Sequence, residues 1–154
     1  MTTPVRNDQG LSRREELTVS SAAMADVPWA VAGGAGVVVA GADLLFHLLG
    51  GHLALTSSLS AGTVAAFTVA GSSVVIRRNA SRAARWARSH PWRFAVLPGV
   101  ATAAIVFVLA VLGPSGLLGG IFTAAWHGAI TFGLTGAVGT IAGGRRSDKS
   151  RAGY

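Results

Sequence analysis

The residues best suited to chemistry are an acid and two histidines that lie inside long apolar stretches. Asp43 is followed four residues later by His47, so on a helix the two side chains share one face and can hydrogen-bond. A carboxylate near the centre of a membrane helix costs about 2.5–3.5 kcal/mol on insertion scales, which makes it a candidate functional group. With His127, Thr63 and Thr123 as neighbours, the pair is expected to line a polar pocket that opens to the outer side of the membrane.

Two interpretations of this cluster are open. In the functional one, the ionisable groups bind a cation, relay a proton or hold a polar headgroup during transfer. In the structural one, Asp43 stays protonated or bonds His47 and a backbone carbonyl, and so fixes its helix in place. A metal site built from Asp43, His47, His52 and His127 is a weaker interpretation, because these ligands lack a compact spacing. We therefore expect neither a metal ion nor another cofactor.

The elements that must position these residues are four apolar stretches, residues 28–49, 55–76, 94–113 and 117–143. The chain is 51% apolar and only 12% charged, which excludes a disordered chain, and the absence of cysteine excludes a disulfide framework. About 20 residues of helix cross a bilayer core of roughly 30 Å. Because backbone groups in lipid must be bonded within their own segment, we predict an all-α polytopic membrane protein of four transmembrane helices in two parallel hairpins.

The distribution of basic residues predicts the orientation. All 13 lysines and arginines lie within residues 6–14, 77–93 and 145–151, and the connections around 50–54 and 114–116 have none. The positive-inside rule then places the tail 1–27, the middle loop and the tail 145–154 in the cytoplasm. We expect a multi-pass protein of the cytoplasmic (inner) membrane whose partner is the lipid bilayer. In the first tail, a short helix from Ser12 towards Ala25 and a poorly ordered segment are both open.

The middle loop carries arginines and no acid. Arg78, Arg82 and Arg85 follow helical spacing, and with Arg88 they predict a basic stripe on an extension of the second span. Near an anionic leaflet each arginine contributes on the order of 1 kcal/mol of attraction, so contact with anionic lipid headgroups is one interpretation. The other is that these arginines only fix the topology. Nucleic acid is not expected as a partner, because the stripe is short and tied to the membrane.

Small residues recur at spacings that suit close helix packing. Gly36, Gly128, Gly139 and Gly143 belong to such series within the apolar stretches. Glycine lets membrane helices approach closely and gain van der Waals contact, so we predict a tight bundle, with a homo-oligomer or a larger membrane complex as a further partner. No nucleotide-binding loop, serine-hydrolase elbow or zinc-protease motif occurs, so we expect no catalytic residues and no enzyme.

The two halves of the chain resemble each other. Residues 28–29 and 91–92 are both Pro-Trp, and 77–78 and 145–146 are both Arg-Arg. The spans before the outer connections end similarly, in Leu-Leu-Gly at 48–50 and Val-Leu-Gly at 111–113. A parallel duplication of a helical hairpin would produce this pattern, and so would the general need of four-span proteins for interfacial tryptophans and basic helix ends.

A run from Ala32 to Leu49 that contains Asp43-Leu44-Leu45-Phe46-His47, then Arg77-Arg78, then Arg93-Phe94, resembles the GtrA-like family of small four-span membrane proteins. That resemblance covers about residues 29–146. It implies a transporter or flippase-like function for polyprenyl-phosphate-linked sugars in cell-envelope glycan synthesis, with the sugar lipid as a partner.

Two alternatives stand beside it. Gly51-His52-Leu53 leading into a span closed by Arg77-Arg78, and Pro114–Leu117 opening the last span, are similar to ATP synthase protein I. This second resemblance implies an accessory or assembly role in a membrane complex such as the ATP synthase. The glycine series alone suggest a third class, an oligomeric structural or holin-like membrane protein.

Overall fold

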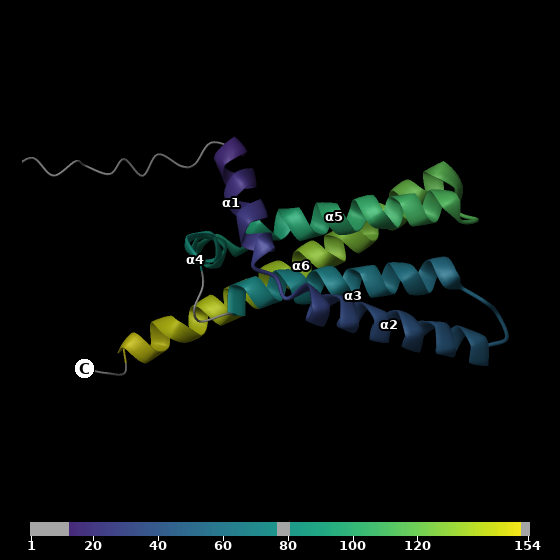
Figure 1. Ribbon diagram of the computed structural model, residues 1–154, viewed down its shortest axis with the longest axis horizontal. Helices are drawn as coiled ribbons and strands as arrows, with labels where there is room; N and C mark the ends of the chain where they lie inside the picture. Colours follow the sequence, from purple (N-terminus) through teal and green to yellow (C-terminus); the bar gives the residue numbers. More distant parts are fainter. Residues whose placement is uncertain (1–12, 77–80, 152–154) are drawn as a thin grey trace, which may run out of the picture.

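The chain is built from helices alone in the residues that its computed structural model describes, 13–76 and 81–151, with side-chain packing described for 14–76 and 81–142 (Figure 1). In chain order these helices are α1 (Arg13–Ala25), α2 (Trp29–Leu49), α3 (Leu55–Ile76), α4 (Arg82–Ser89), α5 (Pro91–Leu112) and α6 (Gly116–Arg151).

Four of the helices are long and apolar enough to cross a membrane: α2, α3, α5 and residues 116–142 of α6. Many of their large apolar side chains face outward, and Leu49, Leu112 and Phe122 are exposed over 86%, 82% and 77% of their surface. Water would oppose such exposure, whereas lipid tails solvate it. The predicted all-α membrane protein with four spans is therefore confirmed, and the chain is membrane-embedded.

Two helices begin or end at residues other than those predicted for the spans. α5 begins at Pro91, before the expected start at residue 94, because proline suits the first turn of a helix, where its missing N–H has no partner to lose. α6 continues to Arg151 as one helix, past the expected end at 143. In the N-terminal tail, the residues from Arg13 to Ala25 form a helix.

The spans form two hairpins, α2–α3 and α5–α6, whose short connections lie at the same end of the bundle (Figure 1). We call this the loop end, and the opposite end, where α1 and α4 lie, the basic end. Gly51 and Gly116 have φ values of 80° and 64°, a conformation that favours glycine in these two turns. α3 is central, because it packs against α2, α5 and α6, whereas α2 packs against α3 alone among the described helices.

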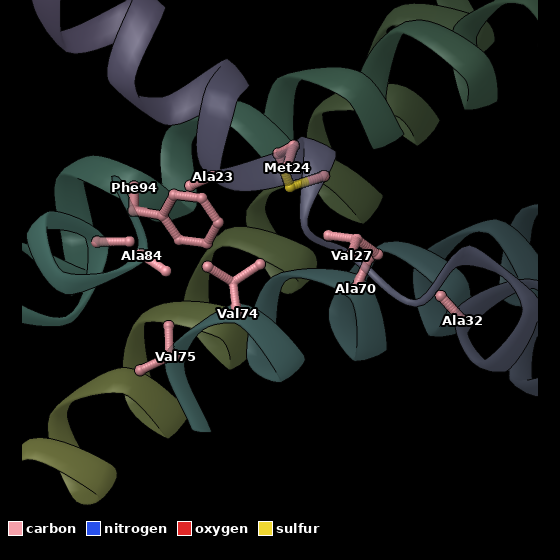
Figure 2. Packing of buried hydrophobic residues seen from close by; sticks show 10 residues of the cluster. Ala23, Met24, Val27, Ala32, Ala70, Val74, Val75, Ala84 and Phe94 are labelled. Carbon is pink, nitrogen blue, oxygen red and sulfur yellow. The ribbon is translucent and has the colours of Figure 1, made fainter. Parts of the chain in front are cut away.

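The basic end is closed by a small apolar core. Figure 2 shows the ring of Phe94 between Ala23 of α1, Ala84 of α4 and Val74 of α3, and all four residues are buried. Glu16 of α1 also forms an ion pair with Arg93 at the start of α5. These contacts attach α1 and α4 to the ends of the spans.

Both hairpins cross at a pair of glycines. A Cβ added to Gly36 would lie 2.8 Å from the carbonyl oxygen of Gly62, and one added to Gly62 would lie 2.6 Å from that of Gly36. In the second hairpin, Cβ atoms on Gly99 and Gly128 would lie 3.1 and 2.9 Å from each other's carbonyl oxygen. Glycine at these positions lets the backbones touch.

Two further glycines were predicted to serve packing. Gly139 of α6 lies directly against Pro91, and a Cβ added to Gly139 would clash with the Cβ of Pro91. Gly143 lies beyond the residues whose side-chain packing is described.

The two helix crossings are formed by residues at equivalent positions in the two similar halves of the sequence. Pro28 and Pro91, Trp29 and Trp92, Gly36 and Gly99, Ala40 and Ala103, and Gly50 and Gly113 are pairs separated by the same number of residues. Ala40 lies against Gly62 as Ala103 lies against Gly128. Trp29 contacts Phe67 and Trp92 contacts Phe132, with ring centroids 6.0 and 5.4 Å apart. The second half thus repeats the packing of the first, as a duplicated hairpin would.

Replacing Gly36 with alanine should destabilise the fold, because the new methyl group has no space against α3. Overpacking of this kind typically costs about 1–3 kcal/mol. Gly34→Ala is the matched control, since nothing lies within 4 Å of a Cβ at Gly34. Thermal unfolding in detergent measures both, and equal melting temperatures for the two variants would contradict the predicted crossing.

Candidate functional site

A cavity of about 730 Å³ lies at the loop end, between the two hairpins. All four spans contribute to it, together with the connections before α3 and α6. Its polar lining residues are Asp43 of α2, Thr56, Ser57 and Ser60 of α3, Ser115 of the second connection, and Thr123 and His127 of α6. The rest of the lining is apolar: Leu53, Ala54, Leu55, Ala61, Ala110 and Pro114. We call this space the loop-end cavity.

Asp43 reaches across from α2 to the first turn of α3. The hydroxyl of Ser58 donates to its Oδ2 at 2.8 Å, and that of Ser57 lies at 3.4 Å from the same oxygen. A carboxylate at the start of a helix also interacts favourably with the positive end of the helix dipole. The acid is thus partly satisfied by α3 while about a third of its side chain, 32%, stays exposed.

His47 supports Asp43 from the next turn of α2. Its Nδ1 lies 2.8 Å from the backbone oxygen of Asp43 and 3.3 Å from Oδ2. The ring of His52 contacts that of His47, with centroids 5.2 Å apart. Within the described part of the chain, no three histidine or acidic side chains are grouped so that they could hold a metal ion.

His127 brings an imidazole to the cavity from α6. Its Nδ1 lies 2.7 Å from the backbone oxygen of Thr123. A carbonyl only accepts, so Nδ1 carries the hydrogen of that bond, and in the neutral ring Nε2 is then an acceptor. The cavity therefore combines a carboxylate and an imidazole from different hairpins with several hydroxyl groups.

Three of the five residues predicted to form a polar pocket, Asp43, Thr123 and His127, line this one cavity. His47 contacts Asp43 but is not among the lining residues, and neither is Thr63, whose hydroxyl donates to the backbone oxygen of Leu59 at 2.8 Å. The hydroxyls at the start of α3 were missed. The run Thr56-Ser57-Ser58, which lies next to the connection between two spans, was the sequence feature that could have predicted these hydroxyls.

The predicted basic stripe lies at the other end of the bundle. Arg82 and Arg85 of α4 are exposed, and Arg88 is half-buried with its Nε donating to the backbone oxygen of Ala84 at 3.3 Å. Arg78 lies outside the described residues. The expected continuous extension of the second span is wrong, because Ser81 is extended and its side chain caps a new helix by accepting from the N–H of Ala84 at 3.2 Å.

Among the residues whose side-chain packing is described, five buried hydroxyls have no hydrogen-bond partner within the protein, and the sequence analysis did not predict them. We call them the core hydroxyls: Thr68 and Ser72 of α3, Thr102 of α5, and Thr131 and Thr135 of α6. A buried hydroxyl without a partner costs about 1–3 kcal/mol, so such groups call for an explanation. The signal in the sequence was their spacing, because Thr131 and Thr135 continue the four-residue steps of Thr123 and His127.

Comparison with models of protein families, with curated proteins and with solved structures finds no match to this chain. Nothing in the comparisons identifies it as GtrA-like or as ATP synthase protein I, so both resemblances stay predictions. The fold and the loop-end cavity are therefore the observations from which function can be argued.

The contact between Asp43 and Ser58 should be measurable as a coupling energy. In a double-mutant cycle with Asp43→Asn and Ser58→Ala, we expect a coupling of about 0.5–1.5 kcal/mol, within the range found for polar contacts between membrane helices. The same cycle with Ser57→Ala should give a smaller value, because its hydroxyl lies farther away. Reversible unfolding in mixed micelles measures both cycles. A coupling near zero for Ser58, or a larger one for Ser57, would contradict the geometry.

Proposed function

We propose that this small integral membrane protein takes the headgroup of a polyprenyl-phosphate-linked sugar into the loop-end cavity and helps move it across the cytoplasmic membrane for cell-envelope glycan synthesis. The observation that carries the proposal is the composition of the cavity. It combines one carboxylate, one imidazole and several hydroxyls at the end of four spans that expose many large apolar side chains.

The chemistry of the cavity suits a sugar. Sugar hydroxyls both donate and accept hydrogen bonds, and they need partners of both kinds when they leave water. Asp43 offers acceptor oxygens, Nε2 of a neutral His127 is an acceptor, and the hydroxyls of Thr56, Ser60 and Thr123 can also accept. The volume of about 730 Å³ falls within the range of small-molecule sites, roughly 300–1,000 Å³.

The rest of the bundle suits the lipid part of such a substrate. Leu53 and Leu55, which line the cavity, are also exposed over 71% and 57% of their surface, so the cavity borders a lipid-facing apolar surface. A polyprenyl chain could stay in the bilayer there while the sugar occupies the cavity.

The two ends of the bundle differ in charge, which supports different roles for them in the transfer. Arg82 and Arg85 are exposed at the basic end, where they would attract a lipid phosphate from an anionic leaflet. The described cavity lining contains neither lysine nor arginine. With the basic end in the cytoplasm, as the positive-inside rule predicts, phosphate attraction would operate on the inner side and sugar binding on the outer side.

A second candidate, an oligomeric structural or holin-like protein, is favoured by one observation. Among the described helices α2 packs on α3 alone, and no atom beyond the local backbone of α2 lies within 4 Å of Cβ positions built on its Gly33, Gly34 and Gly41. A second copy could pack on that surface. The accessory role in a complex such as the ATP synthase rests on the sequence resemblance.

Binding of a sugar lipid should depend on the cavity. In lipid nanodiscs, we expect the protein to retain a short-chain polyprenyl-phosphate sugar at least ten-fold better than the same polyprenyl phosphate without the sugar, as measured by native mass spectrometry. Asp43→Asn and Thr123→Val should each remove most of that preference, because each removes a polar group from the cavity.

Thr63→Val is the matched control, since Thr63 lies on α3 but does not line the cavity. It should keep the preference. Equal retention of both lipids by the unaltered protein would overturn the proposal, and so would the same loss of preference in Thr63→Val as in Thr123→Val.

A further inference from the structure

A second polar cavity lies at the basic end. α1 lies beside the start of α5 (Figure 1), and residues of these two helices line a cleft of about 370 Å³. The lining residues are Glu16, Leu17 and Ser20 of α1 and Arg93, Val96 and Leu97 of α5. We call this space the α1–α5 cleft. It shares no lining residue with the loop-end cavity, so it is a separate site.

The cleft holds one cation and one anion. Glu16 and Arg93 form an ion pair, yet 58% of the Arg93 side chain and 25% of the Glu16 side chain stay exposed. A guanidinium has several N–H donors and a carboxylate has several acceptor positions, so one ion pair leaves part of each unused. The pair can therefore bind a further ligand that carries both a negative and a positive group.

Ser20 supplies a polar group that has no partner within the described protein. The residue is only 4% exposed, and its hydroxyl makes no hydrogen bond to another described residue. Its neighbours Thr18 and Ser21 differ, because each donates to a backbone oxygen of α1 at 2.9 Å. A buried hydroxyl without a partner is costly. Since Ser20 lines the cleft, a ligand there can supply the missing hydrogen bond.

An apolar groove adjoins the cleft. Val96 lines the cleft and also a cavity of about 230 Å³ between α5 and α6. All residues that line this second cavity are apolar or glycine, and Gly99 and Gly128 of the helix crossing are among them. Val96 and Val100 are exposed over 48% and 61% of their surface, so the cavity borders the lipid-facing surface. We call it the α5–α6 groove.

The cleft and the groove together have the length of one leaflet. Arg93, Val96, Val100 and Ala103 are separated by three or four residues, so they share one side of α5. Arg93 lines the cleft and Ala103 lines the groove. At 1.5 Å per residue, they are about 15 Å apart along the helix. That distance is half of a hydrocarbon core of roughly 30 Å.

We propose that the cleft and the groove bind one molecule of phosphatidylethanolamine from the leaflet at the basic end. Arg93 donates to the lipid phosphate, and the lipid ammonium donates to Glu16. The hydroxyl of Ser20 donates to a phosphate oxygen. One acyl chain lies in the α5–α6 groove.

The paired charges distinguish this lipid from others. A headgroup that is only negative would bring its phosphate beside the carboxylate of Glu16, and such a contact between like charges is unfavourable. Phosphatidylcholine carries both charges, but its quaternary ammonium has no N–H to donate to Glu16. The exposed Arg82 and Arg85 of α4 do not line the cleft, so their general attraction for anionic lipids is a separate effect.

This inference does not rest on the proposed transfer of a sugar lipid. The loop-end cavity takes no part in it, and the variants below leave the lining of that cavity intact. Failure of one proposal can therefore be told from failure of the other.

The test measures lipid affinity of the full chain in detergent by native mass spectrometry. Phosphatidylethanolamine, phosphatidylglycerol and phosphatidylcholine with identical acyl chains are compared. We expect the first to bind at least five-fold more tightly than either of the others. Free phosphoethanolamine at the same concentration should not compete, because it has no chain to place in the groove.

Two variants and two matched controls locate the site. Glu16→Gln should raise the affinity for phosphatidylglycerol and abolish the preference for phosphatidylethanolamine over it, because only the charge of Arg93 then remains in the cleft. Ser20→Ala should weaken binding of phosphatidylethanolamine at least three-fold. Glu15→Gln and Ser21→Ala change adjacent residues of α1 that do not line the cleft, and both should bind as the unaltered protein does.

The variants should keep the fold, because buried Ala23 and Met24 also attach α1 to the bundle, and elution from a gel-filtration column checks this. A gain in affinity for phosphatidylglycerol in Glu16→Gln is a result that unfolding would not produce. Binding of phosphatidylglycerol by the unaltered protein as tightly as phosphatidylethanolamine would overturn the proposal. An unchanged preference in Glu16→Gln, or equal losses in Ser20→Ala and Ser21→Ala, would also overturn it.

Discussion

The close approach of helix backbones at glycines is the contact on which the rest of this structure depends. Membrane helices gain no hydrophobic free energy by leaving lipid, so their association relies on van der Waals contact and hydrogen bonds. The reciprocal contacts of Gly36 with Gly62 and of Gly99 with Gly128 set the distance and the register within each hairpin. That register places Asp43 opposite the first turn of α3. Without it, the acid would face lipid and lose Ser58.

The two hairpins share a packing plan but not a chemistry. Counted from the crossing glycines, the position that matches Asp43 in the second hairpin is Val106, and the position that matches His127 in the first is Ala61. The loop-end cavity therefore takes its carboxylate from one hairpin and its imidazole from the other. A duplicated scaffold that carries different polar groups in each copy yields an asymmetric site. Such a site can hold a substrate whose two sides differ.

Much of the architecture could be predicted from the sequence, because a bilayer permits few kinds of backbone structure. Apolar length fixes the number of spans, and an acid within a span, such as Asp43, must have a compensating environment. The depth along each helix was enough to associate Asp43 with Thr123 and His127. The depth of a residue in the membrane does not say towards which side of its helix the side chain points. For this reason Thr63 was expected in the pocket, although it is not among the residues that line the cavity.

Other features depended on contacts between helices that sequence spacing does not specify. The separate α4 follows from the cap made by Ser81, whereas the arginine spacing alone suggested continuation of the preceding span. Thr131 and Thr135 stand at regular spacing, but only the packing of α3, α5 and α6 shows that their hydroxyls are buried without partners. The loss of a partner is a property of the bundle, so no single helix reveals it.

The most direct test of the account is whether water reaches the loop-end cavity from the side opposite the arginine clusters. The chain contains no cysteine, so single cysteines can be introduced without a background. Thr123→Cys lies in the cavity, and Phe122→Cys, at the adjacent position, replaces a side chain that is 77% exposed on the outer surface of the bundle. In intact cells, a membrane-impermeant thiol reagent added outside should label the first and spare the second. Equal labelling of the two variants, or labelling of Thr123→Cys only from the cytoplasmic side, would contradict access of water to the cavity from outside.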